Sequence, residues 1–132
     1  MQIVRDLLAP VDAATLFSYV DDLSVYERWM PLIHDVRPVQ VGPDVNPVWS
    51  VELRAQVGPF ARSKRLRMER TAHELDRLAV FERNEDDGRT HSPWLLRAEL
   101  SPGAGRAPST TLTMSLSYGG SLWSGAVLQR VL

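Results

Sequence analysis

The sequence predicts an α+β fold in which a curved antiparallel sheet of about six to seven strands surrounds a C-terminal helix, with two short helices after the first strand. Most segments between residues 33 and 118 alternate apolar and polar side chains and are separated by Gly, Pro or acidic turns, which is typical of antiparallel strands. Residues 121–132 instead place apolar side chains at helical spacing on one wide face. Consecutive strands with short turns favour a strongly curved sheet over β-α-β units.

The N-terminal part predicts one strand followed by two short helices. Residues 2–8 are read as the strand, and Asp12 is placed to cap a helix over residues 13–20. Ser24 is predicted to cap the second helix, which Pro31 stops because proline has no backbone N–H to donate.

The remaining strands are predicted from alternation and from the turns between them. The pattern is clearest where Trp49, Val51 and Leu53 share one parity and Ser50 and Glu52 have the other. The predicted strands cover residues 33–41, 48–57, 60–71, 78–83 and 110–118. Residues 89–100 are predicted to contain a further strand, which includes Trp94 and is interrupted early by Pro93.

The C-terminal helix is predicted over residues 121–132, with Ser121 as its N-cap. A helix of about 12 residues is roughly 18 Å long. It ends in Val131 and Leu132 without a glycine, polar or basic stop signal. We therefore expect these two residues either to be frayed or to contact a second chain, as in a homodimer formed through this helix.

Composition limits the class of protein. The 132 residues suffice for one domain, expected to span residues 1–132, and the net charge of −1 gives no general attraction to nucleic acid or anionic membranes. The absence of cysteine excludes disulfides, thiolate metal sites and cysteine nucleophiles. No apolar run approaches the roughly 20 residues that span a bilayer, and no signal peptide is evident, so we expect a cytoplasmic protein without a membrane span.

Several stretches together carry a family resemblance. Residues 9–17 read APVDAATLF and residues 21–31 read DDLSVYERWMP; the Trp49 strand, the Gly58-Pro59 turn and the Gly119-Gly120 pair before the last helix fit the same pattern. This layout resembles the START/Bet v 1-like superfamily (SRPBCC), in particular its polyketide cyclase/dehydrase and lipid-transport branch. The resemblance implies a helix-grip fold with an apolar cavity between the sheet and the C-terminal helix, a helix that is usually longer in that family.

The inward-facing apolar residues are the candidate ligand-binding residues. From periodicity alone they form a filled core, whereas the resemblance favours a cavity that holds an apolar or aromatic small molecule, such as a lipid or a polyketide. No cofactor is expected. The candidates are Phe17, Trp49, Leu53, Met68, Phe81, Trp94, Leu96, Met114, Tyr118 and Trp123.

The alternative is an enzyme of the aromatase/cyclase type that uses the same cavity. Its catalytic residues are unknown from the sequence, since the charged side chains of the best strands fall on the outer parity and only Tyr118 is an inward phenol. His91 is a weaker candidate, because its parity is opposite to that of Trp94. His34 and His73 are expected at the surface or at strand edges, and no histidine spacing indicates a metal site.

A basic run lies on the predicted strand over residues 60–71. It offers nucleic-acid or lipid-headgroup binding as a third function, but cross-strand pairing with Glu52, Glu69, Glu82 and Glu85 is the simpler interpretation, so no nucleic-acid partner is expected. The run consists of Arg62, Lys64, Arg65, Arg67 and Arg70.

Overall fold

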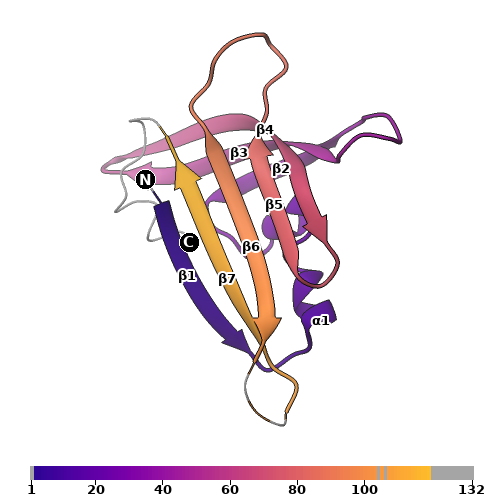
Figure 1. Cartoon of the computed structure of the whole chain (residues 1–132). Coiled ribbons are helices and arrows are strands. Elements are labelled where there is room, and N and C mark those ends of the chain that lie inside the picture. Colours follow the sequence, from indigo (N-terminus) through magenta and orange to yellow (C-terminus); the bar gives the residue numbers. More distant parts are fainter. Residues whose placement is uncertain (1, 104, 106, 120–132) are drawn as a thin grey trace.

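The computed structural model describes residues 2–103, 105 and 107–119, which form one seven-stranded antiparallel sheet and two short helices (Figure 1). The helix predicted over residues 121–132 lies outside the described residues. In chain order the elements are β1 (Gln2–Ala9), α1 (Ala13–Phe17), α2 (Leu23–Tyr26), β2 (Ile33–Val39), β3 (Val48–Val57), β4 (Phe60–Glu74), β5 (Leu78–Arg83), β6 (Trp94–Pro102) and β7 (Thr110–Tyr118).

The strand order is β1-β7-β6-β5-β4-β3-β2, so β2 to β7 form a meander. The first strand joins this meander at its far edge, where β1 pairs antiparallel with β7 and Ile3 lies opposite Leu116. The two short helices carry the chain from one edge of the sheet to the other. One edge strand of the sheet, β1, is therefore held by pairing between residues more than 100 positions apart in the sequence.

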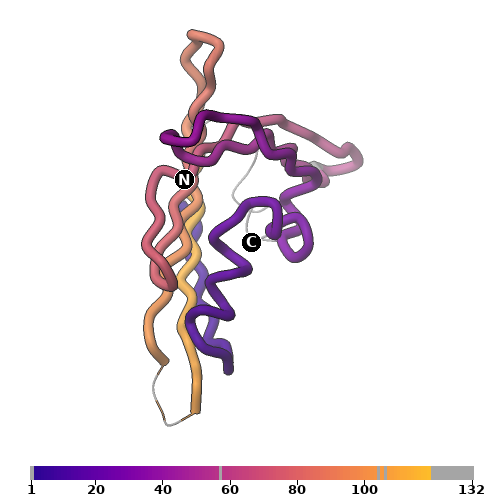
Figure 2. Tube along the Cα trace, turned by 90° about the vertical axis from the view of Figure 1, so that its right-hand side faces the viewer, coloured from indigo at the N-terminus to yellow at the C-terminus, as the bar shows by residue number. Residues whose placement is uncertain are grey.

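The sheet is strongly curved, and the helices lie on its concave side (Figure 2). Strands β2, β3 and β4 curl over from the direction of β1, β7, β6 and β5 (Figures 1 and 2). Register shifts occur between Ile33 and Asp35 in β2 and between Arg70 and Ala72 in β4. Such irregularities bend a strand and increase its twist.

Aspartates cap both helices. The carboxylate of Asp12 accepts from the backbone N–H of Thr15 at 2.7 Å, which confirms the predicted cap of α1. The second predicted cap is wrong: Asp22 caps α2 and accepts from the N–H of Ser24 at 2.8 Å. The carboxylate one position before the helix reaches the unpaired N–H, so Ser24 lies inside the first turn.

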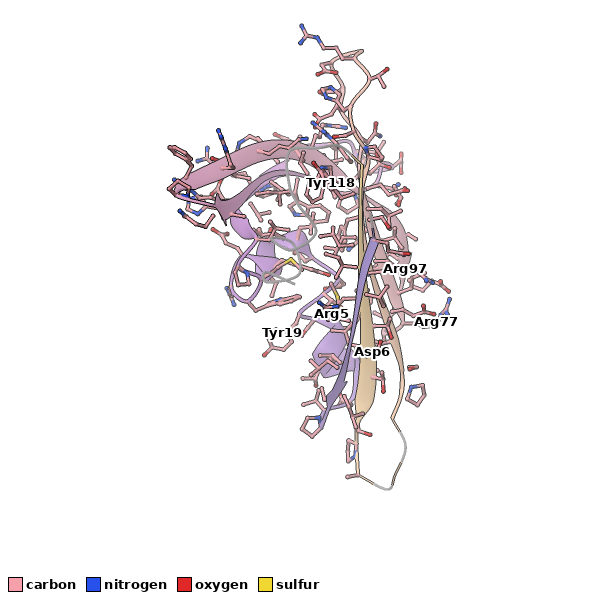
Figure 3. The ribbon with its side chains drawn as sticks, turned by 90° about the vertical axis from the view of Figure 1, so that its left-hand side faces the viewer. Arg5, Asp6, Tyr19, Arg77, Arg97 and Tyr118 are labelled. Carbon is pink, nitrogen blue, oxygen red and sulfur yellow. The ribbon has the colours of Figure 1, made fainter. Side chains whose placement is uncertain are left out.

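The alternation predicted for the strands is confirmed by burial. Trp49, Val51 and Leu53 of β3 are buried, and every second residue of β7 from Thr110 to Tyr118 is buried. On the convex face, Arg97 and Glu99 form an ion pair at 3.0 Å. Figure 3 shows Arg77 and Arg97 on this convex side, opposite the side from which Tyr19 projects.

Several predicted boundaries are corrected. Helix α1 ends at Phe17 instead of residue 20, β2 ends at Val39 instead of residue 41, and β4 continues to Glu74 instead of ending at residue 71. Strand β6 begins at Trp94, directly after Pro93, and continues to Pro102 instead of ending by residue 100. Residues 84–93 form a loop that rises above the sheet (Figure 1).

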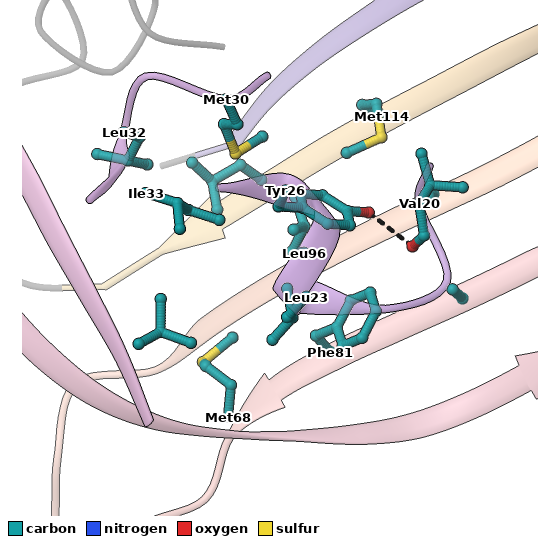
Figure 4. Packing of buried hydrophobic residues seen from close by; sticks show 14 of the residues in the cluster. Val20, Leu23, Tyr26, Met30, Leu32, Ile33, Met68, Phe81, Leu96 and Met114 are labelled. Carbon is teal, nitrogen blue, oxygen red and sulfur yellow. Dashed lines mark hydrogen bonds between the residues drawn. The ribbon is translucent and has the colours of Figure 1, made fainter. Parts of the chain in front are cut away.

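Tyr26 ties the helices to the core. Its side chain is fully buried, its hydroxyl donates to the carbonyl oxygen of Val20 at 2.8 Å, and its ring meets the edge of Phe81 at 5.8 Å (Figure 4). Arg70 adds a second link, donating to the carbonyl oxygen of Asp21 at 2.9 Å. The segment between α1 and α2 is thereby fixed to β4 and β5, and α2 covers the concave face.

Candidate ligand-binding site

An apolar pocket of about 30 Å³ lies between α2 and the concave face of the sheet. Its exposed lining area contains no polar atoms. The lining includes Leu23 of α2, Met30 and Leu32 of the following segment, and Leu53, Met68 and Trp94 of the sheet. These side chains meet because the strands around the pocket present their apolar parity toward the concave side, where α2 lies.

Four of the predicted ligand-binding residues line this pocket, namely Leu53, Met68, Trp94 and Leu96. The other described candidates are buried in the same core but do not line the pocket. Trp49 meets the edge of Phe81 at 5.7 Å, Phe17 lies 5.4 Å from the ring of His73, and Tyr118 lies 4.4 Å from the ring of Trp94. Those not lining it are Phe17, Trp49, Phe81, Met114 and Tyr118, while Trp123 lies outside the described residues.

Trp94 carries a buried polar atom without a partner. The side chain is 2% exposed, and its indole nitrogen Nε1 makes no hydrogen bond. A buried N–H without an acceptor costs about 1–3 kcal/mol, so such groups are rare in folded proteins. Trp94 also lines the pocket, so this unpartnered N–H belongs to a side chain of the pocket wall.

Other hollows differ in character. An apolar groove of about 250 Å³ runs between β1, β7 and the helices and includes Leu7, Tyr19 and Trp29, of which the sequence predictions identified none. The exposed positions of these three side chains depend on how the helices cross the sheet, which alternation alone does not predict. A larger open hollow of about 600 Å³ lies near the turn between β4 and β5 and the end of β6, beside Arg77 and Glu99 and away from the predicted ligand residues.

A polar cluster lies next to the pocket, at the base of the 84–93 loop. We define it as Lys64, Arg83, Glu85, His91 and Ser92. The guanidinium of Arg83 is 8% exposed and donates to Glu85 at 2.9 Å and to the carbonyl oxygen of Ser92 at 3.2 Å. Arg83 follows Phe81 on the same face of β5 and pairs with Met68 across the strands, so the cluster joins the pocket wall.

His91 is held by two charged groups. Its Nδ1 lies 3.3 Å from Arg83 Nη2, and its Nε2 lies 2.8 Å from a carboxylate oxygen of Asp87. Because a guanidinium can only donate, Nδ1 accepts and Nε2 carries the proton that is donated to Asp87. The sequence analysis assigned His91 the strand parity opposite to that of Trp94. Because His91 lies in a loop, strand parity does not determine its direction.

The basic run of β4 is divided between the two faces of the sheet. Arg65 lies on the convex face and pairs with Asp35 and Glu52, each at 3.1 Å, which confirms cross-strand pairing at this position. Lys64 has the parity of the buried Leu66 and donates to the hydroxyl of Ser92 at 3.3 Å. Burial, followed by the nearby Arg83 guanidinium, lowers the pKa of the Lys64 ammonium, and Glu85 partly offsets this.

Comparisons with known proteins identify the family. The family model described as "Polyketide cyclase / dehydrase and lipid transport" matches residues 9–132. The chain belongs to this family. No curated protein matches the sequence.

Solved structures of similar fold agree with this family. A START superfamily protein from Mycobacterium smegmatis has a TM-score of 0.71 at 17% identity, covering 98% of this chain and 85% of its own. The Zhui aromatase/cyclase from a Streptomyces species has a TM-score of 0.63 at 12% identity, covering 96% and 72%. A Deinococcus radiodurans protein has a TM-score of 0.65 at 19% identity, covering 89% and 83%. The curved sheet with short helices is thus the helix-grip fold of the START/Bet v 1 superfamily.

Within the described residues, this member of the polyketide cyclase/dehydrase and lipid-transport family has no group of three or more histidine, aspartate or glutamate side chains placed to hold a metal ion. No helix in the same part of the chain is long and apolar enough to cross a membrane.

Proposed function

We propose that the protein binds an apolar or aromatic small molecule, such as a lipid or a polyketide, in the pocket between α2 and the concave face. The observation that carries the proposal is Trp94, which lines an apolar pocket and whose buried indole N–H lacks an acceptor. Apolar walls with few polar groups are typical of small-molecule sites. The family's description as cyclases, dehydrases and lipid-transport proteins supports the same ligand chemistry.

The pocket has to widen for such a ligand to enter. Its volume of about 30 Å³ is far below the roughly 300 Å³ or more that ligand sites occupy. Met30 and Met68 line it, and methionine side chains change rotamer easily because they are unbranched. Burying about 300 Å² of ligand surface would contribute roughly 7 kcal/mol before the costs of association.

The test uses 2-acetylnaphthalene, which combines an apolar ring system with one carbonyl acceptor. We expect saturable binding by calorimetry and an increase in Tm. Trp94→Phe keeps an aromatic ring but removes the donor, so affinity should fall about fivefold to thirtyfold. Trp49→Phe is the matched control, because Trp49 is equally buried but does not line the pocket.

Two outcomes would contradict the proposal. One is the absence of any binding or thermal shift for 2-acetylnaphthalene, decanol and a wider lipid panel, together with no bound molecule in native mass spectrometry of the purified protein. The other is an equal loss of affinity in both tryptophan variants, since that would place the effect in the general packing of the core.

A second candidate function is ring closure and dehydration of a poly-ketone chain in the same pocket. The position of Tyr118 favours it, because its ring packs at 4.4 Å on Trp94, which lines the pocket. Tyr118→Phe is expected to abolish turnover of a poly-ketone substrate and to leave its binding intact. Unchanged turnover would remove Tyr118 from the mechanism.

A further inference from the structure

Lys64, the single lysine of the chain, borders the proposed ligand pocket. It pairs across the strands with Leu53 and lies two residues before Leu66 on the same face of β4, and both of these residues line the pocket. Its ammonium also donates to Ser92, two residues before the pocket residue Trp94. Strands β3 and β4 and the 84–93 loop therefore place this ammonium beside the pocket.

The Lys64 ammonium has more hydrogen-bond donors than its contact with Ser92 uses. An ammonium offers three N–H donors, and the bond to Ser92 at 3.3 Å uses one of them. Lys64 forms no ion pair with a carboxylate in the described part of the chain. The nearby Glu85 is already engaged, because one of its oxygens accepts from Arg83 at 2.9 Å and from the backbone N–H of Arg67 at 3.0 Å.

The charges nearest Lys64 already pair with each other. Arg83 and Glu85 form a part-buried ion pair, and the Asp87 carboxylate accepts from the ring of His91 further out on the loop. The ammonium of Lys64 is therefore the positive charge next to the pocket that lacks a countercharge in contact. An ammonium held partly out of water without a partner is destabilised, and a carboxylate brought beside it would relieve this cost.

Lys64 and the pocket residue Trp94 also match in the kind of polar group that each carries. The ammonium of Lys64 and the indole N–H of Trp94 can only donate hydrogen bonds. A ligand group that complements both must therefore accept and need not donate. A carboxylate meets this requirement and adds the missing negative charge.

We propose that the ligand is an apolar carboxylic acid in its ionised form, whose carboxylate pairs with the ammonium of Lys64 while its apolar part fills the pocket beside Trp94. This proposal rests on the proposed small-molecule binding and specifies its ligand class. A planar anionic partner, such as a membrane surface, fits less well, because Lys64 is on the concave face of the sheet.

The experiment compares decanoate with decanol, which share one chain length and differ in charge. Because Lys64 is the only lysine, ¹³C-labelled lysine gives one side-chain signal whose titration reports its pKa without any mutation. Decanoate should raise the pKa of Lys64 by about 1 pH unit or more, and decanol should not. This readout also remains valid if a substitution at position 64 disturbs folding.

Affinities of variants provide the second readout. Lys64→Met should weaken decanoate binding about tenfold or more and change decanol binding less than twofold, whereas Lys64→Arg should retain most of the decanoate affinity. Arg54→Met is the matched control, because it removes one exposed positive charge of the adjacent strand on the convex parity. It should leave both affinities unchanged.

The outcomes separate the two proposals. If decanol binds but decanoate leaves the pKa of Lys64 unchanged, or if Lys64→Met weakens both ligands equally, the carboxylate proposal is overturned and small-molecule binding stands. If neither ligand binds and the wider panel also fails, both proposals are overturned.

Discussion

At the scale of single residues, Tyr26 illustrates how a polar group stabilises an apolar core. Its ring is buried against Phe81, and its hydroxyl has one polar partner, the carbonyl oxygen of Val20. Burial, followed by the charge of Asp21, raises the pKa of this hydroxyl well above its ordinary value of about 10. The sequence predicts that Tyr26 lies on a short helix, but it does not predict the hydrogen bond from its hydroxyl to Val20.

We expect Tyr26→Phe to lower the free energy of unfolding by about 1–2 kcal/mol, because the buried carbonyl of Val20 loses its donor. Urea unfolding followed by circular dichroism measures this change. Tyr19→Phe is the control: Tyr19 is 53% exposed, so the effect should stay within about 0.5 kcal/mol. Equal effects at both positions would show that the buried hydrogen bond is not the cause.

Alkaline pH provides a separate test of Tyr26. The folded state keeps the hydroxyl protonated, whereas the unfolded chain ionises it near pH 10, so this contribution is complete below about pH 10 and is lost as the pH rises further. Between pH 8 and pH 11 the urea midpoint of wild type should therefore fall more than that of Tyr26→Phe. Tyr19→Phe should retain the wild-type fall, and identical curves for wild type and Tyr26→Phe would contradict the assignment.

At the scale of elements, β4 shows how one charged strand serves two faces. Its alternation sends Arg65 to the carboxylates of β2 and β3 on the convex face and Lys64 to the pocket side. In the sequence these two residues belong to a single basic run. The strand's period of two separates their roles, since adjacent side chains point to opposite faces.

The cap of α2 allows a test at the same scale. Asp22→Ala should destabilise the protein by about 1 kcal/mol, because the carboxylate that accepts from the Ser24 N–H is removed, and Asp22→Ser should restore most of the loss. Thermal and urea unfolding measure both. Ser24→Ala distinguishes the structural cap from the predicted one: it should cost less than about 0.5 kcal/mol, and a larger loss there than at Asp22 would favour Ser24 as the cap.

At the scale of the whole molecule, ligand binding requires the space between α2 and the sheet to open. The walls are held from several sides, by α2, by the segment after it and by β3, β4 and β6. Opening can therefore occur through side-chain rotation in the core without separation of hydrogen-bonded strands. The methionine side chains in the walls need little free energy for such rotation, because they are unbranched and flexible.

Labelling of methionine methyl groups with ¹³C tests this opening. On addition of decanol, the methyl signals of Met30 and Met68 should shift saturably, because both line the pocket. Met114 is the internal control, since it is buried in the same core but does not line the pocket. A shift confined to Met114 would place the ligand elsewhere on the concave face.

Local patterns in the sequence determine much of the fold. The inward parity of Trp49, Leu53 and Leu96 follows from alternation, which is a property of each strand by itself. The cap at Asp12 also follows from sequence, because donor and acceptor lie three positions apart. Strand faces, turns and one helix start are therefore predictable before any tertiary contact is known. The short turns between consecutive strands also favour a curved sheet.

Only the tertiary structure decides which of these faces meet. Three features depend on residues that lie far apart in the chain. They are the pairing of β1 with β7, the bond between Lys64 and Ser92, and the burial that leaves the N–H of Trp94 without a partner. A periodic pattern states which side a residue faces but not which strand lies beside it. Long-range packing determines which strands are neighbours. Of two inward-facing residues, it therefore places Phe81 in the filled core and Met68 in the pocket wall.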